Sequence, residues 1–242
     1  AIVTGSGTGI GRAIAQALHS LGANVSIADL NGNAALTVAA DLSHVGPTCL
    51  GLQLDVSEAT SVAAGVAMAI DHWGRIDILI NNAGTSGESA PVWEATDANW
   101  AHVLAVNLTG TFHMCRAVLP SMRKRGYGRI VNVSSISARD GNANAAAYSA
   151  SKAGILGLTR ALSLEVADAG ILVNAVSPAA VDTERALAAD QASRAPLIDK
   201  IPMGRAARPE EVADLVLFLA SPACAFSTGA NFDISGGRAN IT

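Results

Sequence analysis

Short apolar segments alternate with longer amphipathic segments over nearly the whole chain. The short segments are rich in β-branched residues, and several are apolar throughout, which is typical of strands that are covered on both faces. The predicted strands are residues 1–4, 24–28, 48–54, 76–81, 129–134, 171–176 and 230–234, and the predicted helices are residues 10–21, 34–42, 57–72, about 97–122, 148–167 and 209–220. This alternation predicts an α/β fold with a doubly wound parallel sheet of about seven strands and helices on both faces.

No internal repeat, low-complexity segment or shift in composition separates parts of the 242 residues, so we expect a single domain over residues 1–242. Gly22 after the first predicted helix, and Ser57 and Pro209 at the starts of two others, agree with the helix boundaries. Residues 179–207 interrupt the alternation at the carboxyl edge of the sheet. We expect a substrate lid there, and a mobile surface loop is the alternative.

The charges of the chain are scattered rather than grouped, and its formal net charge is −4. Nucleic acids and anionic membranes need a basic surface, so neither is expected as a partner. The one dense basic cluster, residues 123–125, lies where a helix is predicted to end. Positive charge is favourable at that end of a helix dipole, so this cluster does not predict a binding patch.

The three cysteines, Cys49, Cys115 and Cys224, are far apart and lack the spacing of metal ligands. We therefore expect reduced, buried thiols and no metal site. No apolar run approaches the ~18–20 residues that span a bilayer. Residues 1–5 lack the charged and apolar regions of a signal peptide, and these features together favour a cytoplasmic protein.

A glycine-rich turn, Thr-Gly-Ser-Gly-Thr-Gly-Ile-Gly at residues 4–11, joins the first strand to the first helix. Gly5 allows the tight turn, Gly9 lets the backbone approach a diphosphate, and Gly11 lets the helix pack closely on the strand. The phosphates would face the N-terminus of the helix, where free N–H groups and the dipole favour negative charge. The strand before the turn and the helix after it raise this pattern above chance and predict a dinucleotide site.

Asp29 ends the second predicted strand, where a carboxylate accepts hydrogen bonds from both hydroxyls of an adenosine ribose. A 2′-phosphate there would meet a fixed negative charge, and the neighbouring Thr8, Leu30 and Asn31 supply no cation. The sequence therefore favours NAD over NADP. The alternative role of Asp29 is to cap the turn that follows the strand.

Tyr148 and Lys152 stand four residues apart in a predicted helix, so they share one face. Tyrosine has a reference pKa of ~10, and lowering it by ~3 units requires a preference of ~4 kcal/mol for the phenolate. A positive charge ~4 Å away supplies about that much at an effective dielectric of ~20. Lys152, helped by an oxidised nicotinamide, is therefore predicted to lower the pKa of Tyr148 enough for proton exchange with an alcohol or a carbonyl.

Further motifs occur in a fixed order along the chain. They are residues 4–11, Asp55-Val56, Asn81-Asn82-Ala83-Gly84, Asn107, Ser135, Tyr148-x-x-x-Lys152 and residues 174–183. In this order and spacing the chain resembles the short-chain dehydrogenase/reductase family over essentially its whole length. The resemblance implies a Rossmann-type fold, a homotetramer, and hydride transfer between NAD(H) and a secondary alcohol or ketone.

The resemblance also implies roles for individual residues. Ser135, thirteen residues before the tyrosine, would hydrogen-bond the substrate oxygen, and Tyr148 would exchange the proton as general acid and base. Lys152 would bind the nicotinamide ribose, and Asn107 would hold a water that links Lys152 to solvent. The implied cofactor-binding residues are Gly5, Thr8, Gly9, Ile10, Gly11, Asp29, Asp55, Val56, Asn82, Ala83, Gly84, Tyr148, Lys152, Pro178, Val181 and Thr183.

Several of these residues also have a purely structural interpretation. Asn107 could kink its helix, Ser134 or Ser135 could cap a strand end, and Asp55 could cap the third helix. The chain departs from the family pattern at Ala179, where glycine is usual after the proline. This departure puts in doubt the contacts at the carboxamide end of the nicotinamide.

Three other functions remain open at the level of sequence. The first is an NADPH-dependent 3-oxoacyl-carrier-protein reductase, for which Arg205 and Arg208 are candidates for a basic patch. The second is a redox-inactive NAD-sensing or scaffold protein on the same fold, which is expected to lose the Ser–Tyr–Lys set. The third is an epimerase or dehydratase with the same Tyr–Lys pair, which generally has a longer C-terminal substrate domain.

Small or apolar side chains dominate the segments expected to shape the substrate pocket, which are residues 86–93, residues 137–145 and the lid. They favour a modest secondary alcohol or ketone, and Arg139 and Asp140 are near enough to contribute. The last helix carries the apolar residues Val212, Leu215, Val216, Phe218 and Leu219. We expect this helix and the strand after it to pack against a second copy of the chain.

Overall fold

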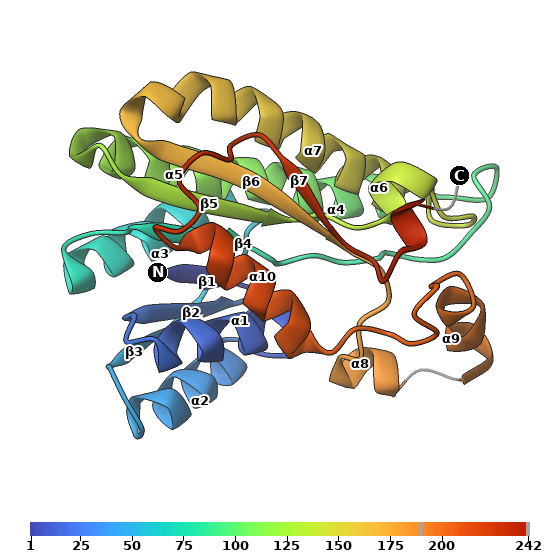
Figure 1. The fold of residues 1–242 in the computed structure, drawn as a ribbon, viewed down its shortest axis with the longest axis horizontal. Coiled ribbons are helices and arrows are strands. Elements are labelled where there is room, and N and C mark those ends of the chain that lie inside the picture. The colour runs from blue at the N-terminus through green and yellow to red at the C-terminus, as the bar shows by residue number, and fades with distance from the viewer. Residues whose placement is uncertain (189–190, 241–242) are drawn as a thin grey trace.

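A seven-stranded parallel sheet forms the centre of the molecule, for which the computed structural model describes residues 1–188 and 191–240 (Figure 1). The strand order is β3-β2-β1-β4-β5-β6-β7. The strands are β1 (Ile2–Thr4), β2 (Val25–Asp29), β3 (Cys49–Gln53), β4 (Ile78–Asn81), β5 (Gly128–Val133), β6 (Ile171–Pro178) and β7 (Asn231–Ile234). The predicted doubly wound α/β fold is therefore confirmed.

Two layers of helices cover the two faces of the sheet, as Figure 1 shows. One layer contains α1 (Gly9–Ser20), α2 (Gly32–Ser43) and α10 (Pro209–Ala220), and the other contains α3 (Ala59–Trp73), α5 (Gly110–Arg125) and α7 (Ala146–Val166). Each layer buries its own apolar cluster against the strands, which explains why the strands are apolar on both faces.

The order of the strands creates a crevice at the carboxyl ends of β1 and β4. From β1 the chain winds outward through β2 and β3, and β4 then pairs with the other side of β1 before the chain continues to β5. The loop after β1 runs to one face of the sheet and the loop after β4 runs to the other face, so an opening remains between the two loops. Ligands of doubly wound sheets bind at this point of reversal.

Most predicted elements agree with the structure within two residues, and the largest difference concerns residues 97–122. This stretch is divided into α4 (Asp97–Leu104), a π-helical segment (Ala105–Thr109) and α5. The third helix begins at Ala59 rather than at Ser57, because Asp55 accepts hydrogen bonds from the backbone and the hydroxyl of Ser57 and forms a turn there.

Short helices that were not predicted occur between and after the main elements, and two of them lie in the predicted lid. They are α6 (Ser137–Asp140), α8 (Glu184–Leu187), α9 (Gln191–Ile198) and 3-10 turns at Ala167–Ala169 and Arg238–Asn240. Residues 189–190 of the predicted lid lie outside the described residues. No helix among the residues described is both long and apolar enough to cross a membrane.

The last helix, α10, packs closely on α1 within the same chain. Val212, Val216 and Leu219 are buried in the core between this helix and the sheet, so three of the five residues expected to face a second copy face their own domain. Phe218 is half exposed and remains available on the outer side.

Candidate active site

The backbone of the glycine turn has the conformation that lets a ligand and the start of α1 come close to it. Gly5 and Gly9 have φ angles of +60° and +57°, in the left-handed region that favours glycine. A Cβ at Gly11 would lie 2.2 Å from the carbonyl oxygen of Gly5, so only glycine lets α1 begin so near β1. Thr8 is the N-cap residue of α1 but makes no capping hydrogen bond with its side chain. The N-terminus of α1 therefore presents N–H groups that suit an anion.

Asn82, at the end of β4, holds this turn in place. Its side-chain Nδ2 donates to the carbonyl oxygens of Thr4 and Gly5, at 2.9 Å each. In return, Thr4 Oγ1 accepts hydrogen bonds from the backbone N–H groups of Asn82 and Ala83. These bonds join the carboxyl ends of β1 and β4 across the point where the sheet reverses its winding.

A cavity of about 450 Å³ opens in front of the turn. Its lining includes the predicted cofactor residues Gly5, Thr8, Gly9, Ile10, Asp29, Asp55, Val56, Asn82, Ala83, Gly84 and Thr183. Gly11 is buried behind the turn and serves the packing of α1. Glycines where a Cβ would collide, the N-terminus of a helix and carboxylates at the strand ends fit a dinucleotide.

The two aspartates of this cavity cap turns, and both also lie on its wall. Asp29 accepts hydrogen bonds from the backbone N–H groups of Gly7 and Asn31, at 2.9 Å each, and so caps two turns while it lines the cavity. Asp55 caps the turn at Ser57 and lines the same cavity.

A second cavity, also of about 450 Å³, adjoins the first and shares Ile10, Asn82, Gly84, Thr85, Thr183 and Arg185 with it. Seven further residues singled out from the sequence lie on its wall: Ser134, Ser135, Tyr148, Lys152, Pro178, Ala179 and Val181. The structure thus brings residues from β5, α7 and the segment after β6 to one continuous opening. We call the first cavity the dinucleotide cavity and the second the catalytic cavity.

Lys152 is buried, with 4% of its surface exposed. Its Nζ donates to the carbonyl oxygen of Val133 at 2.8 Å and lies 5.7 Å from the centre of the Tyr148 ring. Ser134 donates its hydroxyl to the Lys152 carbonyl, which ties α7 to the end of β5. Burial lowers the pKa of Lys152 from 10.5 to about 8, because the ammonium has lost most of its water.

The pKa of Tyr148 differs from the sequence-based prediction. Burial raises this pKa above the ordinary tyrosine value, and a hydrogen bond with Ser135 acts in the opposite direction without reversing the shift. Lys152 Nζ lies 5.7 Å from the centre of the Tyr148 ring, and its attraction for a phenolate does not reverse the shift. The desolvation of the phenolate outweighs this attraction.

Asn107 lies in the π-helical segment and is fully buried. Its side chain accepts a hydrogen bond from the N–H of Thr85 and donates to the Thr85 carbonyl and to Ser151 Oγ. A Cβ on Gly84 would lie 3.2 Å from Asn107 Oδ1 and 3.5 Å from Lys152 Nζ, so both polar groups lie beside Gly84. π-Helical turns frequently occur at functional sites because the extra residue redirects a side chain.

Comparison with known proteins identifies the family. A model of short-chain dehydrogenases with the description enoyl-(acyl carrier protein) reductase matches residues 5–239. The chain belongs to the short-chain dehydrogenase/reductase family. This assignment makes it an oxidoreductase of a family that binds nicotinamide cofactors.

Individual relatives carry different activities in their names. The chain is 42% identical to 2-dehydro-3-deoxy-L-rhamnonate dehydrogenase (NAD(+)) from Sphingomonas sp. (strain SKA58), over 98% of this chain and 94% of the relative. It is 39% identical to 3-oxoacyl-(acyl-carrier-protein) reductase FabG from Vibrio harveyi, over 98% and 96% of the two chains. The structure of 3-ketoacyl-(acyl-carrier-protein) reductase from Brucella melitensis complexed with NADH is 32% identical, with a TM-score of 0.91 over 98% of this chain and 97% of that chain.

Two residues of the predicted lid, Glu184 and Arg185, were not singled out from the sequence as site residues. Glu184 Oε2 accepts a hydrogen bond of 3.0 Å from the backbone N–H of Gly9, in the turn where a diphosphate is expected. The neighbouring Arg185 lines both cavities and donates to Ser86 Oγ. Both contacts join segments that are far apart in sequence, so no local pattern marks them.

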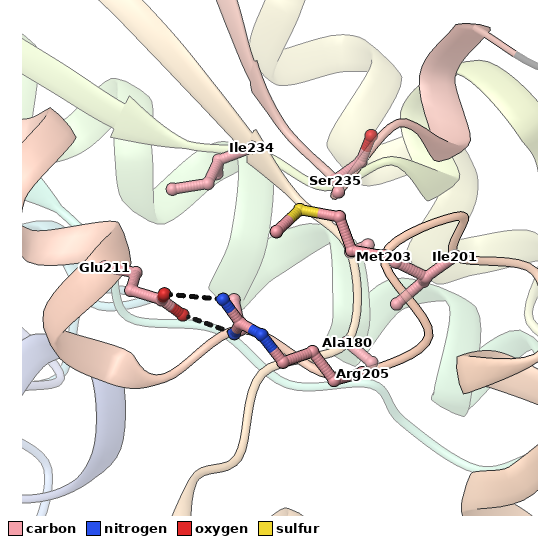
Figure 2. Close-up of a pocket in the computed structure, with 10 residues that line it drawn as sticks. Ala180, Ile201, Met203, Arg205, Glu211, Ile234 and Ser235 are labelled. Atoms are coloured by element: carbon pink, nitrogen blue, oxygen red, sulfur yellow. Dashed lines mark hydrogen bonds and ion pairs between the residues drawn. The ribbon is translucent and has the colours of Figure 1, made fainter.

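A third and smaller cavity, of about 200 Å³, lies behind the lid and shares Ala179 with the catalytic cavity (Figure 2). Its wall is mainly apolar, with Ile201, Met203 and Ile234 around it. Figure 2 shows Arg205 reaching from the lid to Glu211 on α10, with two hydrogen bonds of 2.8 Å. These bonds lower the pKa of Glu211 to about 2, so its carboxylate stays charged.

Proposed function

We propose that the chain is an NAD-linked dehydrogenase or carbonyl reductase that interconverts a secondary alcohol and its ketone, with Tyr148 as the general acid and base. One observation carries the proposal: Ser135, Tyr148 and Lys152 line a single cavity that is continuous with the cavity at the glycine turn. Proton transfer and cofactor binding are thereby brought to one opening, as a coupled transfer of hydride and proton requires.

The nicotinamide, when bound, supplies or accepts the hydride at the substrate carbon. Ser135 Oγ is placed to hydrogen-bond the substrate oxygen, and Tyr148 Oη holds the proton that this oxygen gains on reduction. Because burial raises the pKa of Tyr148, the phenol is protonated at neutral pH and is ready to act as the acid. Lys152, with a pKa of about 8, is still mostly charged there and attracts the phenolate that remains after the transfer.

The NAD preference rests on Asp29. Its carboxylate lies on the wall of the dinucleotide cavity, held by Gly7 and Asn31, and would repel a 2′-phosphate. The residues that follow it in the chain, Leu30 and Asn31, offer no compensating cation. One relative carries NAD(+) in its name and one related structure contains NADH, which supports the same choice.

The alternative with a carrier-protein substrate draws support from the names of several relatives. The candidate basic patch argues against it in this chain. Arg205 and Arg208 both pair with Glu211, at 2.8 Å and 3.3 Å, so one of their two positive charges is compensated within the domain and the candidate patch keeps a single net positive charge. The redox-inactive alternative is also less favoured, because Ser135, Tyr148 and Lys152 are all present and lie together.

The test is Tyr148→Phe, with Tyr127→Phe at the other tyrosine of the chain as the matched control. Each protein is assayed with a panel of secondary alcohols and ketones and with NAD(H) and NADP(H), and NADH binding is measured by fluorescence titration. We expect Tyr148→Phe to lose about 10²- to 10⁴-fold in kcat with little change in the Kd of NADH, because only the proton donor is removed. Comparable turnover in Tyr148→Phe and the control rejects the role of Tyr148.

A further inference from the structure

The wall of the catalytic cavity has few ionisable side chains, and the two that carry a charge are both positive. Tyr148, Lys152 and Arg185 line it, and no aspartate or glutamate of the described residues does. Lys152 is directed inward, where its Nζ donates to the Val133 carbonyl. Arg185, by contrast, is exposed at the opening. Its guanidinium is thus the positive group that an entering substrate meets.

Arg185, on α8, lies where the two cavities meet, because it lines both of them. Glu184, one residue earlier, lines only the dinucleotide cavity and contacts Gly9, whereas Ala186, one residue later, lines only the catalytic cavity. Arg185 itself is joined to Ser86, which lines only the catalytic cavity. The contact with Ser86 therefore ties the guanidinium to the wall of the catalytic cavity, which also contains Tyr148.

The hydrogen-bonding capacity of Arg185 is largely unused. Its Nη2 donates to Ser86 Oγ at 3.3 Å, and no carboxylate among the described residues forms an ion pair with it. A guanidinium has five N–H donors in a planar fork, which matches the two oxygens of a carboxylate. Arg75 and Arg205 show the paired form of this side chain in the same protein, each bound to a carboxylate through two nitrogens.

We propose that the substrate is a hydroxy acid or oxo acid whose carboxylate is bound by Arg185 at the mouth of the catalytic cavity, with Ser86 holding the guanidinium in place. The inference rests on the proposed function and adds a substrate class to it. Because the carboxylate does not change during the reaction, Arg185 binds ground state and transition state alike. Replacing Arg185 is therefore expected to raise KM and to leave kcat unchanged.

The experiment compares methyl-ketone acids of increasing length with their methyl esters, which keep the ketone but remove the charge. Pyruvate, acetoacetate, 4-oxopentanoate and 5-oxohexanoate are reduced with NADH by the wild type, Arg185→Gln and Arg185→Lys. Arg116→Gln removes an exposed positive charge from α5 and is the matched control. Binding of isobutyrate and isobutyramide to the enzyme–NADH complex is measured by calorimetry, so that one readout does not depend on turnover.

In the wild type we expect at least one acid to exceed its ester in kcat/KM by about 10- to 100-fold, the range of a charge-assisted bidentate contact. Arg185→Gln should bring the acid down to its ester through KM and abolish the preference for isobutyrate over isobutyramide. Arg185→Lys should retain part of that preference, and Arg116→Gln all of it.

Three results would overturn the inference, and they differ from failure of the proposed function. Esters that are reduced as well as the acids show that the site ignores charge, although the enzyme is a ketone reductase. A weaker Kd for NADH in Arg185→Gln, with the acid-to-ester ratio intact, shows that Arg185 serves the diphosphate. Equal binding of isobutyrate to wild type and Arg185→Gln removes the carboxylate site itself. Isobutyrate binding that depends on Arg185, with no reduction of any ketone, rejects the proposed function and retains the anion site.

Discussion

Lys152→Met replaces a buried ammonium with an apolar side chain of similar length, and its effect on stability is expected to depend on pH. In the folded protein the pKa of Lys152 is about 8, whereas an unperturbed lysine has 10.5. The difference of about 2.5 units corresponds to about 3 kcal/mol, because one unit is worth ~1.36 kcal/mol. This is the free-energy cost of keeping the charged form inside the fold.

The sign follows from proton binding in the two states. Below pH 8 the lysine is protonated in both the folded and the unfolded chain, so the cost is fully present. Between about 8 and 10.5 the unfolded chain binds more protons, so the wild type becomes more stable relative to its unfolded state as pH rises. Above 10.5 the amine is neutral in both states and the cost is absent. The advantage of Lys152→Met at neutral pH should therefore fall by about 3 kcal/mol across this window.

Urea unfolding of both proteins at a series of pH values, at one protein concentration, measures this difference. Lys152→Met also loses the hydrogen bond from Nζ to the Val133 carbonyl, and it does so at every pH. This loss shifts the free energy of unfolding by a constant amount and does not change how the difference between the two proteins depends on pH. Lys200→Met, at an exposed lysine, is the control and should show no trend with pH. A constant difference between wild type and Lys152→Met from neutral pH to 10.5 would refute the reasoning that burial penalises this ammonium.

Three further predictions concern the cofactor and the assembly. Asp29→Ala should lower the ratio of initial rates with NAD and NADP by about tenfold or more, since it removes the repulsion of a 2′-phosphate; an unchanged ratio means that Asp29 is not the selector. Glu184→Gln should strengthen NADH binding by about three- to tenfold in a fluorescence titration, because a carboxylate no longer competes with the diphosphate for the N–H of Gly9; a weaker Kd would show that Glu184 helps to bind the cofactor. We also propose that the chain forms a homotetramer with α10 and β7 in an interface, and light scattering that finds a monomer at assay concentration would contradict this.

The pattern of neighbouring residues in the sequence was enough to predict the strands, helices and turns on which the candidate site residues lie. The glycine turn, the end of β2 at Asp29, and the shared face of Tyr148 and Lys152 depend on neighbours a few residues away, and the structure places them as predicted. The π-helical segment that divides α4 from α5 was missed, because its sequence continues the helical period.

Contacts between distant segments were beyond the reach of such patterns. Ser134 and Ser135 are adjacent, yet the hydroxyl of Ser134 donates to the Lys152 carbonyl, whereas Ser135 lines the catalytic cavity together with Tyr148. Glu184 meets a residue of the glycine turn, 175 positions away, and Arg185 meets Ser86, 99 positions away. Only the packing of the lid against the loops after β1 and β4 creates these pairs.

The sequence by itself determined the order of strands and helices and the residue types at the carboxyl edge of the sheet, because periodicity and turn chemistry are local properties of a chain. The tertiary structure alone decided the direction of the pKa shifts at Tyr148 and Lys152 and the position of Arg185 at the mouth of the catalytic cavity. Desolvation depends on how many layers of protein surround a group, and that number is set by long-range packing.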